Sequence, residues 1–336
     1  MNPGISIIIC CYNSSKRLPL TVEHILDQKN CASINWEVII VDNASSDNTF
    51  ELAHKLLINN GVDFTVVKEP LPGLANARLK GYNAAKYDYL LYCDDDNYLD
   101  NLYLFRAFET MQNNAKIGVL GGIGEAVFED KEPAWFAQHA ASFAVGDQSF
   151  SRETLSKVNT VYGAGAIMRK EFLYKLYKSG FKSLLLGRTG NQITSGDDNE
   201  LCFMARILGY EVWFDRNLKF KHLMTPGRMN WKYLQKLYAG FGRVNVYIGA
   251  YTFIETHNGI PRQNLRLPFW LDTFIHKAKA ILEFYPKVRG KMNVEGDEDV
   301  LRFIAMKSEA REIWRLKKKY SELYINLSQM LQLIKA

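Results

Sequence analysis

The chain has 336 residues, 47% of them hydrophobic, which is ordinary for a soluble globular protein and leaves room for one large domain with an appendage. Five cysteines form an odd set without a CxxC pair, which favours reduced core thiols over disulfides. The N-terminus lacks a basic, apolar secretory signal, and no stretch reaches the ~18 apolar residues that cross a bilayer. We therefore expect a cytoplasmic protein.

Charge is distributed unevenly along the chain. The formal net charge is +6, yet residues 216–336 contain 22 Lys and Arg against 10 Asp and Glu, and residues 1–215 contain 20 against 26. The sequence thus predicts an acidic first part and a basic C-terminal part. The basic part carries enough apolar and aromatic residues to suggest an anionic surface or partner, with plain solvation as the alternative.

The first hundred residues alternate strand-like and helical segments. Continuous apolar runs predict strands at 5–10, 36–41, 64–67 and 89–93, and three-to-four spacing predicts helices at 18–28, 49–58 and 74–85. Since the apolar runs are continuous, both faces of the sheet must be covered, which indicates a doubly wound, mostly parallel α/β sheet with helices on both faces. Ligands bind beyond the carboxyl ends of such strands. Polar clusters follow three of these strands: Tyr12-Asn13, Asp42-Asn43 and Asp94-Asp95-Asp96.

The rest of the chain is less regular and then becomes helical. Residues 118–124 and 161–168 are rich in small side chains, where another group can approach the backbone. A helix is expected at 198–208 and a strand at 211–220, and beyond Pro226 helical spacing recurs at 271–285 and 316–334. We therefore divide the chain into an α/β domain, 1–225, and a mainly helical basic region, 226–336, which docks on a membrane, dimerises or packs on the core.

The acidic run after the fourth strand is the strongest local signal for chemistry. On an extended strand end Asp94 and Asp96 point the same way, while Asp95 turns elsewhere. Two converging carboxylates suit Mg²⁺ or Mn²⁺, which take oxygen ligands and share them with substrate phosphates. A solvated acidic turn before the next helix is the alternative.

Two residues near the same edge suit a nucleotide. Asp42 can accept hydrogen bonds from a base N–H or a ribose hydroxyl, with an Asx turn as the alternative. Arg78 lies one turn into a helix aimed at this edge, where a helix N-terminus and a fixed positive charge suit a diphosphate. An ordinary surface arginine is the alternative.

Asp197 and Asp198 open the helix at 198–208. One of them is explained as a helix cap stabilised by the helix dipole, and the other is left to act as a general base toward a hydroxyl. His222, after the next strand, is a candidate third metal ligand or leaving-group contact, against the alternative of a satisfied structural histidine.

Together these segments resemble glycosyltransferase family 2, the inverting nucleotide-sugar transferases with a GT-A fold. The resemblance covers about residues 4–225 and rests on six motifs in order: SIIICCYN at 6–13, VDNASSDNT at 41–49, GLANAR at 73–78, LYCDDD at 91–96, GDDNEL at 196–201, and Gly209-Tyr210 followed by His222. It implies that Tyr12, Asn13 and Asp42 hold the nucleoside, that Asp94 and Asp96 belong to the metal and diphosphate motif, and that Asp197 or Asp198 is the base. We assign the base to Asp198, and we place Arg78 and Asp95 in the donor-binding set.

Two departures from the family pattern accompany the resemblance. Cys10-Cys11 replaces the common Pro-Thr or Pro-Ala, which we interpret as a packing variation, and Asp197-Asp198 replaces the usual Glu-Asp, which leaves the choice of base open.

The resemblance implies transfer of a sugar, with inversion, from a UDP-, GDP- or dTDP-sugar to a hydroxyl of a glycan or lipid-linked glycan, in polysaccharide or glycan synthesis, with Mn²⁺ or Mg²⁺ as cofactor. A sugar nucleotidyltransferase is one alternative, disfavoured because no glycine-rich basic loop follows the first strand. A non-catalytic nucleotide-sugar or glycan-binding module is another. Nucleic-acid binding is set aside, because the lysines at 317–319 are few and lie within a leucine pattern. If the basic region binds anionic lipid, we expect the protein at the inner face of the membrane. The other expected partner is a second copy of the chain, in a homodimer.

Overall fold

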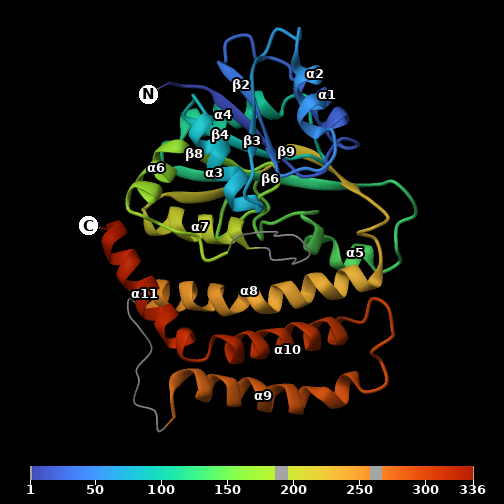
Figure 1. Cartoon of the computed structure of the whole chain (residues 1–336), viewed down its shortest axis with the longest axis vertical. Helices are drawn as coiled ribbons and strands as arrows, with labels where there is room; N and C mark the ends of the chain where they lie inside the picture. Colours follow the sequence, from blue (N-terminus) through green and yellow to red (C-terminus); the bar gives the residue numbers. More distant parts are fainter. Residues whose placement is uncertain (1, 186–195, 258–266, 336) are drawn as a thin grey trace. The chain divides into compact units, whose positions relative to one another are not determined.

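The computed structural model describes residues 2–185, 196–257 and 267–335, which form two compact units (Figure 1). The first, called the sheet unit, comprises Met1–Glu129, Ala140–Gly190 and Asp197–Met224. The second, called the helical unit, comprises Asp130–His139, Asn191–Gly196 and Thr225–Ala336. The described helices include none with the length and apolar character that a bilayer crossing requires.

The sheet unit contains one mixed sheet whose described strands are ordered β3-β2-β1-β4-β8-β6-β9-β5, with β7 paired to β9. The strands are β1 Ile5–Cys11, β2 Trp36–Asn43, β3 Asp63–Glu69, β4 Tyr89–Asp94, β5 Asn97–Leu99, β6 Ile117–Phe128, β7 Leu155–Val158, β8 Ile167–Arg169 and β9 Glu211–Met224. Strands β3, β2, β1 and β4 are mutually parallel, so their carboxyl ends reach the same edge. Antiparallel strands enter only beyond β4, where β8 pairs with β4 and β6, and β5 and β7 pair with β9.

Helices cover both faces of this sheet, as the continuous apolar runs predict (Figure 1). They are α1 Leu18–Leu26, α2 Thr49–Leu57, α3 Leu74–Ala84, α4 Tyr103–Asn113, α6 Lys170–Lys178 and α7 Asp197–Ile207, with a short 3₁₀ turn at Ala140–Phe143. Alternate residues of β1 reach the two faces: Ile7 joins a core with α1 and α4, whereas Ile8 meets α3. A Cβ on Gly81 of α3 would lie 2.4 Å from Ile8 Cγ2, so glycine permits this close approach.

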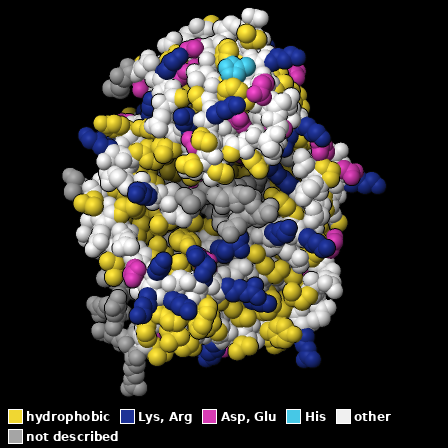
Figure 2. Space-filling view, viewed as in Figure 1, with side chains coloured by type: hydrophobic (Ala, Val, Ile, Leu, Met, Phe, Trp, Pro, Cys, Tyr) yellow, Lys and Arg dark blue, Asp and Glu magenta, His cyan; other side chains and the backbone are white. Residues whose placement is uncertain are grey.

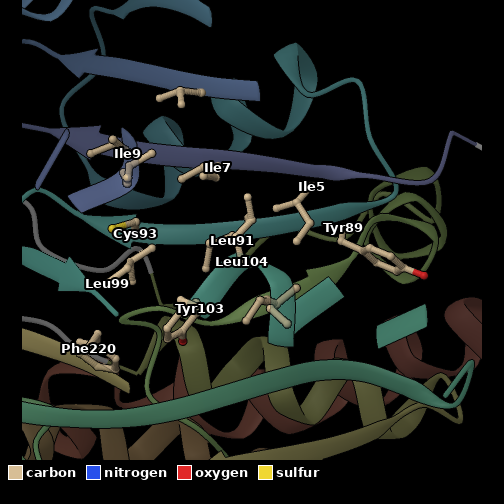
Figure 3. Packing of buried hydrophobic residues seen from close by; sticks show 14 of the residues in the cluster. Ile5, Ile7, Ile9, Tyr89, Leu91, Cys93, Leu99, Tyr103, Leu104 and Phe220 are labelled. Atoms are coloured by element: carbon tan, nitrogen blue, oxygen red, sulfur yellow. The ribbon is translucent and has the colours of Figure 1, made fainter. Parts of the chain in front are cut away.

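The core under α1, α2 and α4 fixes the direction of β1 and β4 (Figure 3). Its fully buried members include Ile5, Ile7 and Ile9 from β1 and Leu91 from β4. Burying each such side chain contributes about 1.5–3 kcal/mol, so β1 and β4, which end at polar clusters, are firmly anchored in the sheet. Cys11 is buried in this core, as expected of the cysteine pair.

The helical unit is built from α5 Phe136–His139, α8 Trp231–His257, α9 Phe269–Val288, α10 Glu298–Leu316 and α11 Lys318–Lys335. Helix α10 packs against both α8 and α9, and α11 contacts all three (Figure 1). A Cβ on Gly242 of α8 would lie 2.1 Å from the Ala305 carbonyl oxygen, so α8 and α10 approach closely at this point.

The predicted α/β class with a C-terminal helical region is confirmed, and every strand and helix expected in the first hundred residues is present. The later segments differ in detail. Of residues 161–168, expected as a small-residue strand or loop, only the end enters the short β8. The helical pattern expected at 316–334 corresponds to α11, which Lys317 separates from α10 through a positive φ of 48°.

Candidate functional site

The loop after β1 is held to the loop after β2 by side-chain hydrogen bonds. Asn13, with φ 50°, accepts at Oδ1 from the Ser46 backbone N–H at 2.8 Å, and its own N–H donates to Ser45 Oγ at 3.0 Å. Asp42 is buried and accepts from the Ser45 N–H at 3.3 Å, which is the turn geometry considered as its alternative role. Tyr12 stands out from this loop with 56% of its surface exposed, and such a ring can stack on a base.

Asp95 turns away from its neighbours, as the strand geometry predicts, and into the loop after β1. Its carboxylate accepts from Ser14 Oγ and pairs with Arg17 Nη2 at 2.6 Å, and its carbonyl accepts from Thr21 Oγ1 at 2.8 Å. Burial and the neighbouring charge of Asp96 raise the Asp95 pKa, against the effect of Arg17. In the described structure Asp95 therefore ties the acidic run to the start of α1, whereas the sequence assigns it to the donor.

Asn43 joins β2 to the loop that begins α3. Its Nδ2 donates to the carbonyls of Glu69 and Leu71, at 3.0 and 2.7 Å, and its Oδ1 accepts from the Gly73 N–H at 2.8 Å. Gly73 precedes α3 with φ 134°, a conformation that side chains rarely adopt. Asn43 thus sets where α3 begins and, with it, the position of Arg78.

Arg78 is buried, and its guanidinium pairs with Asp197 and lies over the Tyr92 ring, 5.5 Å from the ring centre. Burial lowers the Arg78 pKa, but the negative charges of Asp197 and Asp94 outweigh burial and raise it. The arginine is therefore a permanent positive charge between the end of β4 and the start of α7. Its observed partner is a carboxylate of the chain, whereas the sequence predicts a diphosphate contact.

Asp198 lies beside this pair and is held by the backbone. Its Oδ2 accepts from the Gly163 N–H at 3.0 Å and its Oδ1 from the Asn199 N–H at 2.8 Å. Burial, followed by repulsion from Asp197, raises the Asp198 pKa from 3.8 to about 6, against the attraction of Arg78. Of the two acids, Asp197 is neutralised by an arginine, and Asp198 is the one whose affinity for a proton is raised.

Asp96 and His222 meet at the pairing of β5 with β9. His222 donates from Nδ1 to the Phe143 carbonyl at 2.8 Å, which directs Nε2 toward Asp96 Oδ1 at 3.5 Å. A second hydrogen bond of this kind is what usually orients a metal-binding histidine. Within the described ranges no three His, Cys, Asp or Glu side chains form a ready-made metal site. The pair nevertheless fits Mg²⁺ or Mn²⁺, which commonly use one or two protein ligands and complete their shell with substrate phosphates and water.

Several supporting residues were missed by the sequence analysis. Glu200 is buried and accepts from Ser183 Oγ and from the Leu184 N–H at 2.9 Å, so it holds these two residues against α7. Gly163 leaves no room for a side chain, since a Cβ there would lie 2.8 Å from Arg78 Nη2 and 3.2 Å from Asp198 Cβ. The small residues at 161–168 were the available signal for such a close approach.

A family model described as glycosyl transferase family 2 matches residues 6–177, just over half of the chain. The chain belongs to glycosyl transferase family 2. Poly-beta-1,6-N-acetyl-D-glucosamine synthase of Staphylococcus aureus (strain COL) is 29% identical over 169 residues, which are 50% of this chain and 40% of that protein. The synthase of the same name from Staphylococcus epidermidis is 28% identical over 172 residues, 51% of this chain and 40% of that protein. The match thus spans less than half the length of these relatives.

Solved structures of S. aureus TarS share the fold of this family 2 chain. TarS residues 1–349 in complex with UDP-GlcNAc align over 97% of this chain and 92% of that one, with a TM-score of 0.51 and 15% identity. The larger TarS structure aligns over 96% and 55%, with a TM-score of 0.51 and 16% identity. The expected GT-A fold and glycosyltransferase family are therefore confirmed.

Proposed function

We propose that this chain transfers a sugar from a nucleoside-diphosphate sugar to an acceptor hydroxyl, with inversion, and that Asp198 is the general base. The arrangement of two adjacent acids with different partners carries the proposal. Asp197 pairs with Arg78, whereas Asp198 accepts hydrogen bonds from two backbone N–H groups of the described residues and has a raised pKa of about 6. A base is most effective when its pKa lies near the working pH, because it is then ionised and still binds a proton well.

Inversion requires the acceptor oxygen to attack the anomeric carbon from the side opposite the departing diphosphate. Asp198 would take the proton of that hydroxyl during the attack and pass it to solvent afterward. Arg78 would hold Asp197 in place through their ion pair, so that the second acid does not move into the acceptor site. Asp94, which contributes to the charge around Arg78, links this part of the site to the end of β4.

We assign the donor to the edge formed by the loops after β1, β2 and β4. Tyr12 offers an exposed ring for the base, and Asn13 and Asp42 lie in the two loops that hydrogen-bond to each other. Asp95 is assigned to positioning the first of these loops. A bound Mg²⁺ or Mn²⁺ would neutralise charge on the leaving diphosphate. Asp96 and His222 would hold that ion, with Asp94 as a further ligand to test.

A UDP-linked N-acetylhexosamine is the first donor to test, ahead of GDP- and dTDP-sugars. The matched relatives are named as N-acetylglucosamine polymer synthases, and a TarS structure contains UDP-GlcNAc. The acceptor is proposed to be a glycan or lipid-linked glycan in polysaccharide synthesis.

The test compares wild type, Asp198→Asn and the exposed-surface control Asp130→Asn. Donor binding is measured by thermal shift with UDP, GDP and dTDP, with and without Mn²⁺, and turnover by release of the nucleoside diphosphate. We expect one nucleotide to raise the melting temperature of all three proteins, because a ligand that binds only the folded state stabilises it. Turnover should fall about 10²- to 10⁴-fold in Asp198→Asn alone. Equal turnover in Asp198→Asn and wild type would refute the assignment of the base.

A further inference from the structure

Helix α9 leaves several of its apolar side chains exposed on the surface of the helical unit. Most of its residues are apolar or aromatic, yet only Phe284 and Val288 are buried. Leu282 is 73% exposed, Tyr285 48% and Ile275 46%. Single exposed apolar residues are common on proteins, but a row of them along one helix indicates a surface that meets something.

The ring contacts of α9 identify its inner side. Phe274 lies 4.9 Å from the Trp314 ring on α10, and Phe269 stacks on Tyr320 of α11 at 5.3 Å. Residues 275, 279, 282 and 286 recur at intervals of four, three and four and therefore share a face. Leu282 and Lys279 lie on this face, and the Lys279 side chain is 74% exposed. This face is therefore the outer side of the helix.

This outer side is also basic. Besides Lys277, which pairs with Glu309 of α10 at 2.7 Å, residues 269–291 contain the four cations Lys279, Lys287, Arg289 and Lys291 against the two acids Asp272 and Glu283. Figure 2 shows apolar and Lys or Arg side chains interleaved over the helices in the lower part of the view. Cations beside apolar side chains suit the boundary between lipid headgroups and acyl chains, where lysine extends its charge toward the headgroups.

We propose that the outer side of α9 docks the protein on an anionic membrane surface, with the helix lying parallel to the membrane. Ile275 and Leu282 would enter the headgroup region, and Lys279, Lys287 and Arg289 would meet anionic headgroups. A helix of 20 residues provides about 30 Å of such contact.

Charge complementarity favours a membrane over a second copy of this chain. Two copies joined through this face would bring their lysines and arginines together, and like charges across an interface oppose association. Anionic lipids supply the opposite charge along the whole helix. The proposal is independent of the sugar-transfer reaction, so each can fail without the other.

The test is flotation of the full chain with vesicles of phosphatidylcholine, alone or mixed with phosphatidylglycerol. The apolar variant is Ile275→Ser/Leu282→Ser, and its matched control is Leu333→Ser, a leucine of α11 that is 71% exposed. The charge variant is Lys279→Gln/Lys287→Gln, and its control is Lys319→Gln, which is exposed on α11. All changes are at exposed positions, and thermal melts would verify that each variant folds.

We expect wild type to float with the mixed vesicles and to bind phosphatidylcholine alone much less. Binding should weaken about fivefold for each lysine removed, or about 25-fold for the pair, and about tenfold or more for the apolar variant. Both controls should bind as wild type does. The proposal is overturned if the α9 variants bind unchanged, if the controls lose as much as they do, or if binding ignores anionic lipid. It is also overturned if light scattering shows a dimer that the apolar variant breaks.

Discussion

Changing Asp197 to Asn tests whether Asp198 is the titrating base. Repulsion from Asp197 is the second-largest cause of the raised Asp198 pKa, after burial. The amide removes this negative charge, and the guanidinium of Arg78 loses its paired carboxylate but keeps its own charge. Both effects stabilise ionised Asp198, so its pKa should fall toward the ordinary aspartate value.

The size of the effect follows from the ionised fraction. With a pKa of about 6, Asp198 is about nine-tenths ionised at pH 7 and about one-tenth ionised at pH 5. A reaction that needs the carboxylate should therefore have a kcat/KM about tenfold lower at pH 5 than at pH 7 in the wild type. In Asp197→Asn the loss between these pH values should shrink, though not vanish, because burial of Asp198 remains.

The assay is the pH profile of kcat/KM for nucleoside-diphosphate release, measured from about pH 4.5 to 8 with the donor varied at a fixed acceptor concentration. The control is Asp130→Asn, which removes a carboxylate on the exposed surface. It should leave the acid limb of the profile, the fall in kcat/KM at low pH, at the wild-type pH. Breaking a buried ion pair costs about 3–5 kcal/mol, so a thermal melt at each pH must show that the variant is folded.

An acid limb that stays at the wild-type pH in Asp197→Asn would refute the reasoning, because a group other than Asp198 would then set the limb. A limb that moves to higher pH would equally contradict it.

Three further changes test the described contacts. Asp198→Asn should raise the melting temperature above pH 6 but not below pH 4. The native pKa of about 6 exceeds the unfolded value, which penalises the ionised native state by up to about 3 kcal/mol at high pH. A gain in melting temperature confined to acid pH would contradict this. Asp95→Ala should lower the free energy of unfolding in denaturant by about 1–3 kcal/mol, because it removes the acceptor that the Ser14 hydroxyl and the Arg17 guanidinium share in the loop after β1, whereas unchanged stability with a raised donor KM would make Asp95 a direct donor ligand. Gly242→Ala should lower the free energy of unfolding by about 1–3 kcal/mol, because its Cβ would clash with Ala305. Gly249→Ala in the same helix has open space around it and should raise the free energy of unfolding by about 1 kcal/mol. Equal effects of the two changes would refute the close helix crossing.

The first half of the sheet could be predicted because its strands are buried on both faces. A strand such as β1 is then a continuous apolar run, and the polar residues that follow it mark the ligand edge. Helix α10 was harder to predict because Ser308 and Glu312 are buried within it and interrupt its apolar pattern. Glu312 is tolerated there because Arg315, one turn away, and Tyr247 satisfy its carboxylate, and Tyr247 is 65 positions away in the chain.

The candidate site could likewise be predicted only in part. The acids and the loops that carry them could be located from strand ends, but their partners could not. Arg78 and Asp197 are 119 positions apart, and only the folded sheet brings them together. The same holds for Asp95, whose pairing with Arg17 depends on how α1 leaves the sheet. Sequence patterns predict which residues reach an edge, whereas their charges are balanced by contacts between distant segments.

The three hydrogen bonds of Asn43 also explain why an amide follows the acid at the end of β2. One end of its side chain faces the carbonyls of Glu69 and Leu71, and the other faces the Gly73 N–H. An aspartate has the same shape but no donor, so it would set a carboxylate against two carbonyl oxygens beside Asp42. At position 43, therefore, the arrangement of hydrogen-bond donors and acceptors alone favours asparagine over the nearly isosteric aspartate. Because Asn43 sets where α3 begins, this preference also affects the position of Arg78 and so the charge around the base.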